Sequence, residues 1–280
     1  MRSHIDWITF TMSMAYADET TEAYANAIAN GFEDMFGKQL LADAFGGNWT
    51  KNERSRAPYT DSWTLPEASI TLYASPNLTH CCVEISGQGC ERLIAQGCLD
   101  NVLSRCHERI TRIDIASDIE TEVRPTSFVE KVDHERMRTS GHVVSDTGET
   151  CYVGSQKSDR YARVYRYNQP HPRSHLLRIE HVFRREYAKV VAGEIARSGV
   201  DAVAKSAGKA FGWAHTVWTP ESTQEIDLSV VKAEPTMGGT VFWLIKSVAP
   251  AFKKLVAKGI IPDPEKFLRD YFLTDDSPYA

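Results

Sequence analysis

Alternation of apolar and polar residues marks a series of strands along the first two thirds of the chain. It predicts strands over residues 5–13, 68–74, 80–86, 110–118, 149–154, 161–168 and 176–184. Apolar residues at helical spacing predict helices over 20–36, 90–107 and 126–138, and then over 185–198, 200–210, 240–258 and 263–272. Residues 48–66, which are polar and include Pro58, are expected to form an irregular arm.

This order of elements predicts an α+β fold. We expect an antiparallel β-sheet with an open active face, backed by helices and followed by a mainly helical C-terminal part. The expected division is a catalytic sheet-and-helix domain over 1–184 and a helical part over 185–280 that packs against the sheet. No internal repeat is visible in the sequence, although strand–helix–strand order occurs twice before residue 185.

Carboxylates recur on what strand alternation predicts to be one face of the sheet. Glu84, Asp114 and Glu180 each lie in a predicted strand, on the side away from most of that strand's apolar residues. Neighbouring carboxylates raise each other's pKa unless a cation lies between them, and oxygen ligands suit Mg²⁺ or Mn²⁺. The alternative is a solvated face on which the carboxylates form ordinary cross-strand pairs with arginines.

Positive charge is concentrated in one part of an acidic chain. The net charge of the whole chain is −5, yet residues 151–190 contain nine Lys or Arg and only three Asp or Glu. A basic region of this kind indicates an anionic partner. Strand alternation places four of its residues on one face: Tyr161, Arg163, Tyr165 and Tyr167. The following strand presents Arg178 on the same face as Glu180.

Composition is that of a soluble globular protein. No apolar run approaches the ~20 residues needed to span a bilayer, and the N-terminus lacks a basic region followed by a cleavable apolar core. The six cysteines show no Cys-x-x-Cys zinc spacing, which is typical of free thiols in a reducing compartment. We therefore expect a cytoplasmic protein with no membrane partner.

One ordered pattern resembles a known family. From Gly148 to Tyr165 the chain reads G-x-x-x-Y-x-G-S-x-x-S-x-x-x-x-R-x-Y, and R-x-E follows at Arg178–Glu180. This pattern resembles the Rep_trans-type replication initiation factors, which are rolling-circle initiators of plasmids and filamentous phages, together with related relaxases. The resemblance also covers Asp6–Thr11, Val83–Cys90 and Ile110–Asp118.

The resemblance implies a chemistry for the tyrosine. It places Tyr165 in the family's R-[IV]-Y motif as the nucleophile, with Arg163 and Arg178 beside it. Nearby arginines favour the phenolate of a tyrosine, whose pKa is ordinarily ~10. Attack on a phosphodiester would leave a phosphotyrosine linkage and a free 3′-hydroxyl. Glu84, Asp114 and Glu180 are then the expected ligands of Mg²⁺ or Mn²⁺.

The sequence departs from the family directly after the tyrosine, where Arg166-Tyr167 replaces an acidic residue or asparagine followed by lysine. Phosphate contacts are therefore expected from a set of basic and polar residues in this region: Lys157, Ser158, Arg160, Arg163 and Arg166. The Gly154-Ser155 turn is either a phosphate cradle or an ordinary hairpin turn.

Sequence recognition is expected in the C-terminal part. Lys253 and Lys254 lie in a predicted helix with apolar residues on its other face, which suits phosphate contact, although a solvated surface gives the same pattern.

The function that these features predict is initiation of rolling-circle replication, by nicking one strand of origin DNA through metal-assisted tyrosine transesterification. The alternatives are a relaxase of an integrative or conjugative element with the same chemistry, and a metal-dependent endonuclease without a covalent intermediate. A DNA-binding control protein with a degraded centre is disfavoured, because the tyrosine and all three carboxylates are present together. The expected partner is single-stranded or hairpin origin DNA, and we also consider a host helicase and a second copy of the chain.

Overall fold

The protein was analysed as a computed structural model of all 280 residues. The structure describes residues 2–13, 50–65, 69–75, 78, 80–95, 97, 99, 102–103, 109–130, 139–168, 171–211, 226–230, 241 and 244–272. The helix expected over 20–36 lies outside these residues. By the contacts between its residues the chain divides into two compact units, Met1–Val230 and Val231–Ala280.

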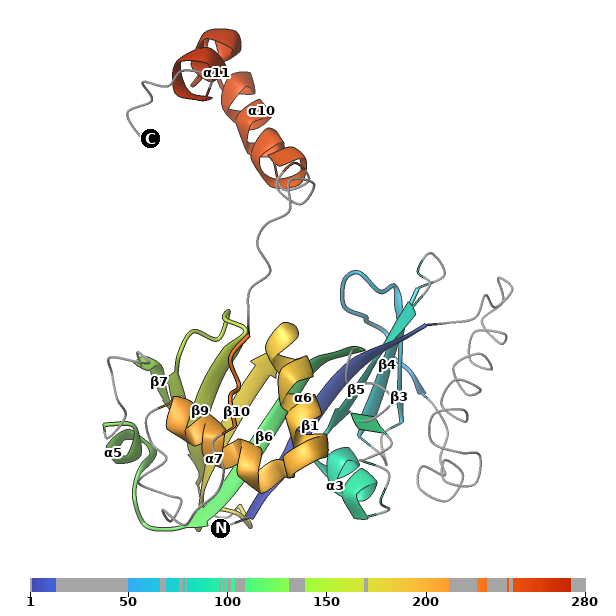
Figure 1. The fold of residues 1–280 in the computed structure, drawn as a ribbon, viewed down its shortest axis with the longest axis vertical. Helices are drawn as coiled ribbons and strands as arrows, with labels where there is room; N and C mark the ends of the chain where they lie inside the picture. Colours follow the sequence, from blue (N-terminus) through green and yellow to red (C-terminus); the bar gives the residue numbers. More distant parts are fainter. Residues whose placement is uncertain are drawn as a thin grey trace. The chain divides into compact units, whose positions relative to one another are not determined.

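The first unit is built on one antiparallel sheet of ten strands, in the spatial order β2-β3-β4-β5-β1-β6-β10-β9-β8-β7 (Figure 1). The strands are β1 (Arg2–Ser13), β2 (Thr50–Lys51), β3 (Asp61–Leu65), β4 (Ile70–Ala74), β5 (His80–Ser86), β6 (Ile110–Glu120), β7 (Thr139–Ser145), β8 (Gly148–Val153), β9 (Arg160–Tyr167) and β10 (Leu176–Arg184). The two longest, β1 and β6, pair at the centre. The predicted α+β class with an antiparallel sheet is confirmed.

Helices cover one face of this sheet. These helices are α3 (Gln88–Ala95), α6 (Glu186–Ser198) and α7 (Val200–Ala210), and a shorter helix, α5 (Pro125–Val129), lies near β8 and β9 (Figure 1). The largest core cluster joins the apolar side chains of β1, β5 and β6, such as Ile8 and Ile113, to Leu93, Val191 and Val203 on the helices. Burial of this face drives the helices onto the sheet, because apolar area removed from water is the main stabilising term. The opposite face of the sheet carries the polar side chains.

Short strands account for the main difference from the sequence-based expectation. The irregular arm predicted over 48–66 contains β2 and β3, and β3 pairs with β4 from Asp61 to Leu65. The strand β7 was also not predicted. Both β2 and β7 are edge strands, so partner strands rather than their own apolar pattern define them.

The second unit contains a short π-helical segment η3 (Leu244–Val248), followed by α10 (Ala249–Ala257) and α11 (Pro264–Phe272). The sequence-based boundary lay at residue 184, whereas α6 and α7 belong to the same compact unit as the sheet. Among the described residues, no helix is both long enough and apolar enough to cross a membrane.

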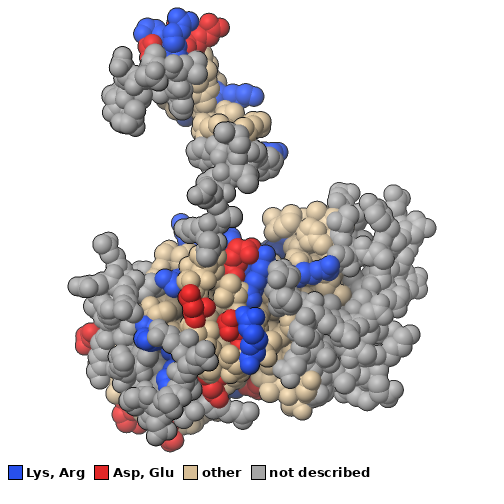
Figure 2. All heavy atoms as spheres, in the orientation of Figure 1, with Lys and Arg blue, Asp and Glu red and all other residues tan. Residues whose placement is uncertain are grey.

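The helix-covered side of the first unit carries charges of both signs. In Figure 2, which has the orientation of Figure 1, acidic and basic side chains alternate over α6 and α7. They include the ion pairs Glu186–Lys189 and Glu194–Arg197. Basic side chains on the described part of α6 are therefore largely paired with acidic ones.

We predict that Gly148→Ala loosens the ladder between β8 and β9. A Cβ at Gly148 would lie 2.3 Å from the Arg166 carbonyl oxygen, so the two backbones must separate. Overpacking of this kind costs about 1–3 kcal/mol, and each kcal/mol lowers the melting temperature by about 2–4 °C in a domain of this size. The matched control is Gly141→Ala in β7, where the nearest atom is a Tyr152 ring carbon at 3.7 Å. Equal melting temperatures for the two variants in thermal unfolding would contradict this close approach.

Candidate active site

The register of β9 and β10 brings the predicted catalytic residues together on the polar face. Arg178 pairs with Tyr165 and Glu180 pairs with Arg163 across the two strands. Residues directly opposite each other in an antiparallel pair share a face. The expected shared faces of Arg163 with Tyr165 and of Arg178 with Glu180 are confirmed, and the register adds that all four side chains lie on one face.

Tyr165 donates a hydrogen bond to Glu180. The Tyr165 hydroxyl lies 3.1 Å from Glu180 Oε2, and Arg163 donates to Oε1 of the same carboxylate. Burial, and then the negative charge of Glu180, raise the pKa of Tyr165 well above its ordinary value of 10, against weaker lowering by Arg178 and Arg163. The expectation that arginines favour the phenolate describes only these weaker contributions. The phenol stays protonated at neutral pH, with its proton directed at Glu180.

Asp114 and Glu180 form a pair of buried carboxylates. Both are 0% exposed, and the carboxyl of Glu180 is within hydrogen-bonding reach of Asp114. Burial and the neighbouring carboxylate raise the pKa of Asp114 to about 7, although Arg112 acts in the opposite direction. Arg112 donates to both oxygens of Asp114, at 2.9 and 2.6 Å. The guanidinium of Arg112 also stacks over Trp7, 4.4 Å from the ring centroid, which fixes its plane.

Arg178 is buried and donates hydrogen bonds to two further carboxylates, those of Asp118 and Asp6. It is 5% exposed, donates to both oxygens of Asp118 at 2.7 Å, and donates to Asp6 at 3.0 Å. A bidentate pair of this kind fixes the geometry of both partners. Much of the positive charge that the sequence places around Tyr165 is thus paired with carboxylates of β1, β6 and β10.

Glu84 lies on the same face but farther away. It is on β5, which is separated from β6 by β1, and Arg56 donates to its Oε2 at 2.7 Å. The structure therefore brings Asp114 and Glu180 into contact and places Glu84 two strands from Asp114.

The Asp114–Glu180 pair fits a divalent cation. Burial and, to a smaller extent, the charge of Glu180 raise the pKa of Asp114, and a cation between the two carboxylates would favour their charged forms. Oxygen donors of this type suit Mg²⁺ or Mn²⁺, which retain waters and substrate oxygens in their coordination shell.

A second group of metal-ligating side chains lies on the other face of the sheet. His142, Glu149 and Cys151 offer ligand atoms within 4.8 Å of one another, and Arg124 donates to Glu149 at 3.3 Å. Cys151 belongs to the apolar cluster of β8 and β9, so this group is separated from Tyr165 by the sheet. Histidine and cysteine ligands suit zinc better than magnesium. This group was not predicted, because its members are not spaced as a motif.

The predicted phosphate-binding residues lie at several places. Lys157 and Ser158 are in the turn before β9, and the Ser158 hydroxyl donates to the Arg160 carbonyl. Arg166 donates to the backbone carbonyls of Thr121 and Val123, so its guanidinium is held by the loop after β6. Lys253 and Lys254 lie on α10 in the second unit and are exposed.

Two residues of the site were missed in the sequence analysis. Arg112 and Asp6 both stand in segments that carry the family resemblance, yet neither was assigned a role. The i, i+2 spacing of Arg112 and Asp114 in a strand is a signal that could have identified their pairing. Asp6 lies at a bulge of β1 between Ile5 and Trp7, which alternation alone does not reveal.

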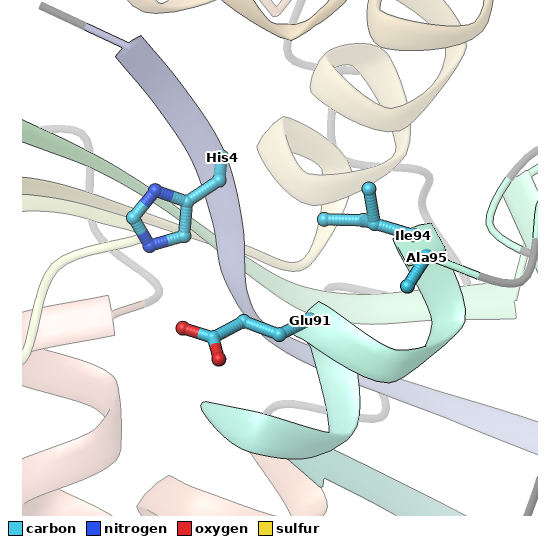
Figure 3. A pocket seen from close by; sticks show the side chains of 4 residues that line it. All are labelled: His4, Glu91, Ile94 and Ala95. Atoms are coloured by element: carbon cyan, nitrogen blue, oxygen red, sulfur yellow. The ribbon is translucent and has the colours of Figure 1, made fainter.

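A hollow lies between the beginning of β1 and helix α3. It has a volume of about 360 Å³ and is lined by His4 on β1 and by Glu91, Ile94 and Ala95 on α3, and the His4 ring lies opposite the Glu91 carboxylate (Figure 3). His4 Nε2 is 3.7 Å from Asp6, and Arg173 donates to Glu91 at 3.1 Å. His4 therefore connects the lining of this hollow to Asp6, which also accepts a hydrogen bond from Arg178.

Comparison with solved structures finds the same fold in a rolling-circle replication initiator protein from Geobacillus stearothermophilus. The TM-score is 0.51 at 16% sequence identity, over 75% of this chain and 85% of that one. No family model matches the chain, and a search of curated proteins gives no match. At this identity the likeness shows the shared fold.

We predict that the buried carboxylate pair makes stability fall as the pH rises. The pKa of Asp114 is about 7 in the folded protein and 3.8 ordinarily, so the folded state binds more protons between these values. The free energy of unfolding should therefore decrease from about pH 4 to pH 7, by at most about 1.4 kcal/mol per pH unit. In the variant Asp114→Asn, the free energy of unfolding should change less with pH. Urea unfolding at several pH values, with chelator present, measures this dependence. An unchanged slope in that variant would contradict the raised pKa.

Proposed function

We propose that this protein initiates rolling-circle replication by nicking one strand of origin DNA, with Tyr165 as the nucleophile. The observation that carries the proposal is the 3.1 Å hydrogen bond from Tyr165 to Glu180, within a buried carboxylate pair on the polar face of the sheet. The fold that this chain shares with a rolling-circle initiator supports it.

Glu180 is placed to take the phenolic proton. As the Tyr165 oxygen forms its bond to phosphorus, the proton passes to Glu180 Oε2, and the bond from phosphorus to the 3′ oxygen breaks. The released 3′ oxygen takes up a proton and becomes the 3′-hydroxyl that a polymerase can extend. Because the raised pKa keeps Tyr165 protonated, the attack on phosphorus needs Glu180 as the acceptor of the phenolic proton.

The surrounding cations have separate roles. Arg163 donates to Oε1 of Glu180 and so orients Oε2 toward the phenol of Tyr165. Arg112 donates to Asp114 and so holds that carboxylate beside Glu180. Asp114 and Glu180 would hold Mg²⁺ or Mn²⁺, whereas Glu84, the third ligand expected from the sequence, lies two strands from β6 and pairs with Arg56. When bound, such an ion supplies charge stabilisation for the phosphoryl oxygens in the transition state.

We predict that Tyr165→Phe abolishes the covalent protein–DNA adduct and strand rejoining, because it removes only the nucleophilic oxygen. Labelled single-stranded origin DNA with Mn²⁺, resolved on denaturing gels, measures the adduct. The matched controls are Tyr161→Phe and Tyr167→Phe, which lie on the same face of β9, four residues before and two residues after Tyr165. Both should retain the adduct, since neither residue stands at the R-[IV]-Y position.

Loss of the adduct in Tyr161→Phe with retention in Tyr165→Phe would show that the nucleophile is misassigned. Cleavage at the normal rate in all three variants, with free DNA ends and no adduct, would instead establish a hydrolytic endonuclease. A relaxase would give the same adduct, and the origin of the nicked DNA, from a replicon or a transfer locus, separates the two.

We predict that nicking requires a divalent ion held by the carboxylate pair. Excess chelator should abolish nicking, and Asp114→Asn or Glu180→Gln should lower its rate by roughly 10²–10⁴-fold. Glu84→Gln is the internal comparison and should cost less, because Glu84 lies two strands from β6 and holds Arg56. Nicking rates at graded Mn²⁺ concentrations separate weakened metal binding from lost chemistry. Full activity in chelator would refute a metal requirement.

A further inference from the structure

The ten-stranded sheet consists of two halves with the same topology. One half has the spatial order β2-β3-β4-β5-β1 and the other has the order β7-β8-β9-β10-β6, so each begins along the chain with the central strand. The registers also agree. In the first half Ile8 pairs with Ile85, which pairs with Ile70; in the second half Ile113 pairs with Phe183, which pairs with Arg160.

The turns that end the two halves agree as well. Gly87 and Arg185 both have positive φ, 46° and 52°, directly before α3 and α6. Their N–H groups donate to Asp6 and Thr111 carbonyls at 2.8 and 2.9 Å. An approximate twofold axis through the Ile8–Ile113 pair therefore relates the halves.

This axis gives each residue of the candidate active site a counterpart in the first half. Tyr73 pairs with Cys82 as Arg163 pairs with Glu180. The counterparts of Asp114, Glu180 and Arg163 are thus Thr9, Cys82 and Tyr73. Trp7 even donates to Thr9 at 2.9 Å, as Arg112 donates to Asp114. Both carboxylates of the second half are thus replaced by neutral side chains in the first half.

In their place the first half presents a stacked arginine with an exposed side. The guanidinium of Arg56 lies 4.0 Å from the Tyr73 ring centroid and donates to Glu84 at 2.7 Å and to Cys82 Sγ at 3.1 Å, and the Arg56 side chain as a whole is 43% exposed. These bonds fix its plane and neutralise its charge. Tyr59 lies beside Tyr73, with ring centroids 6.2 Å apart.

We propose that Arg56, Tyr59 and Tyr73 form a stacking site for a nucleobase of the strand that is nicked at Tyr165, and we call it the N-terminal aromatic site. The inference rests on the proposed function. The registers of the intervening strands support this site, because they place Tyr73 and Tyr165 on the same face of one sheet. A planar guanidinium on an aromatic ring offers a surface on which a base stacks without sequence preference.

The spacing suits a single strand that crosses the sheet. Five strand intervals separate β4 from β9, which corresponds to about 24 Å at ~4.8 Å per interval. At a rise of about 3.4 Å per stacked nucleotide, roughly seven nucleotides cover that distance. Because Glu84 already neutralises Arg56, the contact should depend on the base more than on the phosphate.

The test is binding of oligothymidines of 4, 8, 12 and 16 nucleotides to the full chain, by fluorescence anisotropy in chelator at several salt concentrations. The variant Arg56→Met/Glu84→Gln keeps the net charge, and Arg56→Lys keeps the charge but loses the plane. The matched control is Arg197→Met, an arginine paired with Glu194 on the helix-covered side. Thermal unfolding confirms that each variant is folded.

For 12- and 16-mers, both Arg56 variants should weaken binding by roughly tenfold, the size of one lost base stack, with an unchanged salt slope. The loss should vanish with the 4-mer and with an abasic 16-mer, and Arg197→Met should bind as the parent does. Parental affinity in Arg56→Lys, or a loss that persists on abasic DNA, would overturn the stacking site alone. Failure of the parent protein to bind any single strand would overturn the proposed function, and the stacking site with it.

Discussion

Two carboxylates held in contact away from water are the constraint on which this site depends. Asp114 and Glu180 are both fully buried, and such a pair is unfavourable unless protons, cations or hydrogen-bond donors compensate it. The structure supplies these through Arg112, Arg163 and the phenol of Tyr165. The arrangement that is expected to lower stability at higher pH also directs the Tyr165 hydroxyl at Glu180. The stability of the fold and the position of the Tyr165 hydroxyl thus both depend on this carboxylate pair.

The sheet makes this arrangement possible because it separates apolar from polar side chains with a period of two. Its apolar face is covered by α3, α6 and α7, which leaves the polar face for chemistry. Antiparallel pairing at the centre brings β6 and β10 side by side and therefore fixes Asp114 against Glu180. The two halves of the approximate twofold repeat differ in their side chains: one carries the buried carboxylate pair, and the other carries Arg56 stacked on Tyr73.

Sequence patterning predicted the strands that carry the site, because each is long and alternates clearly, as in β9 and β10. It therefore predicted that Arg163 shares a face with Tyr165 and Arg178 with Glu180, while the β9–β10 register brings the two pairs together. It did not predict β3 or the pairing of Arg178 with Asp6, since both depend on which strands become neighbours. The sequence pattern also did not predict the protonation state of Tyr165. Burial and the charge of Glu180 raise its pKa more than the neighbouring arginines lower it. The repeat escaped notice because it is preserved in register and turn geometry, while the side chains of its two halves differ.

The central claim is that Tyr165 forms the bond to DNA, and mass spectrometry of the trapped adduct tests it most directly. Trypsin cleaves after Arg160, Arg163 and Arg166, so the three tyrosines of β9 fall in three different peptides. After nuclease trimming, the account predicts a nucleotide mass on the peptide Val164–Arg166. A nucleotide on the peptide that contains Tyr161 or Tyr167, or cleaved DNA with no modified peptide, would contradict it.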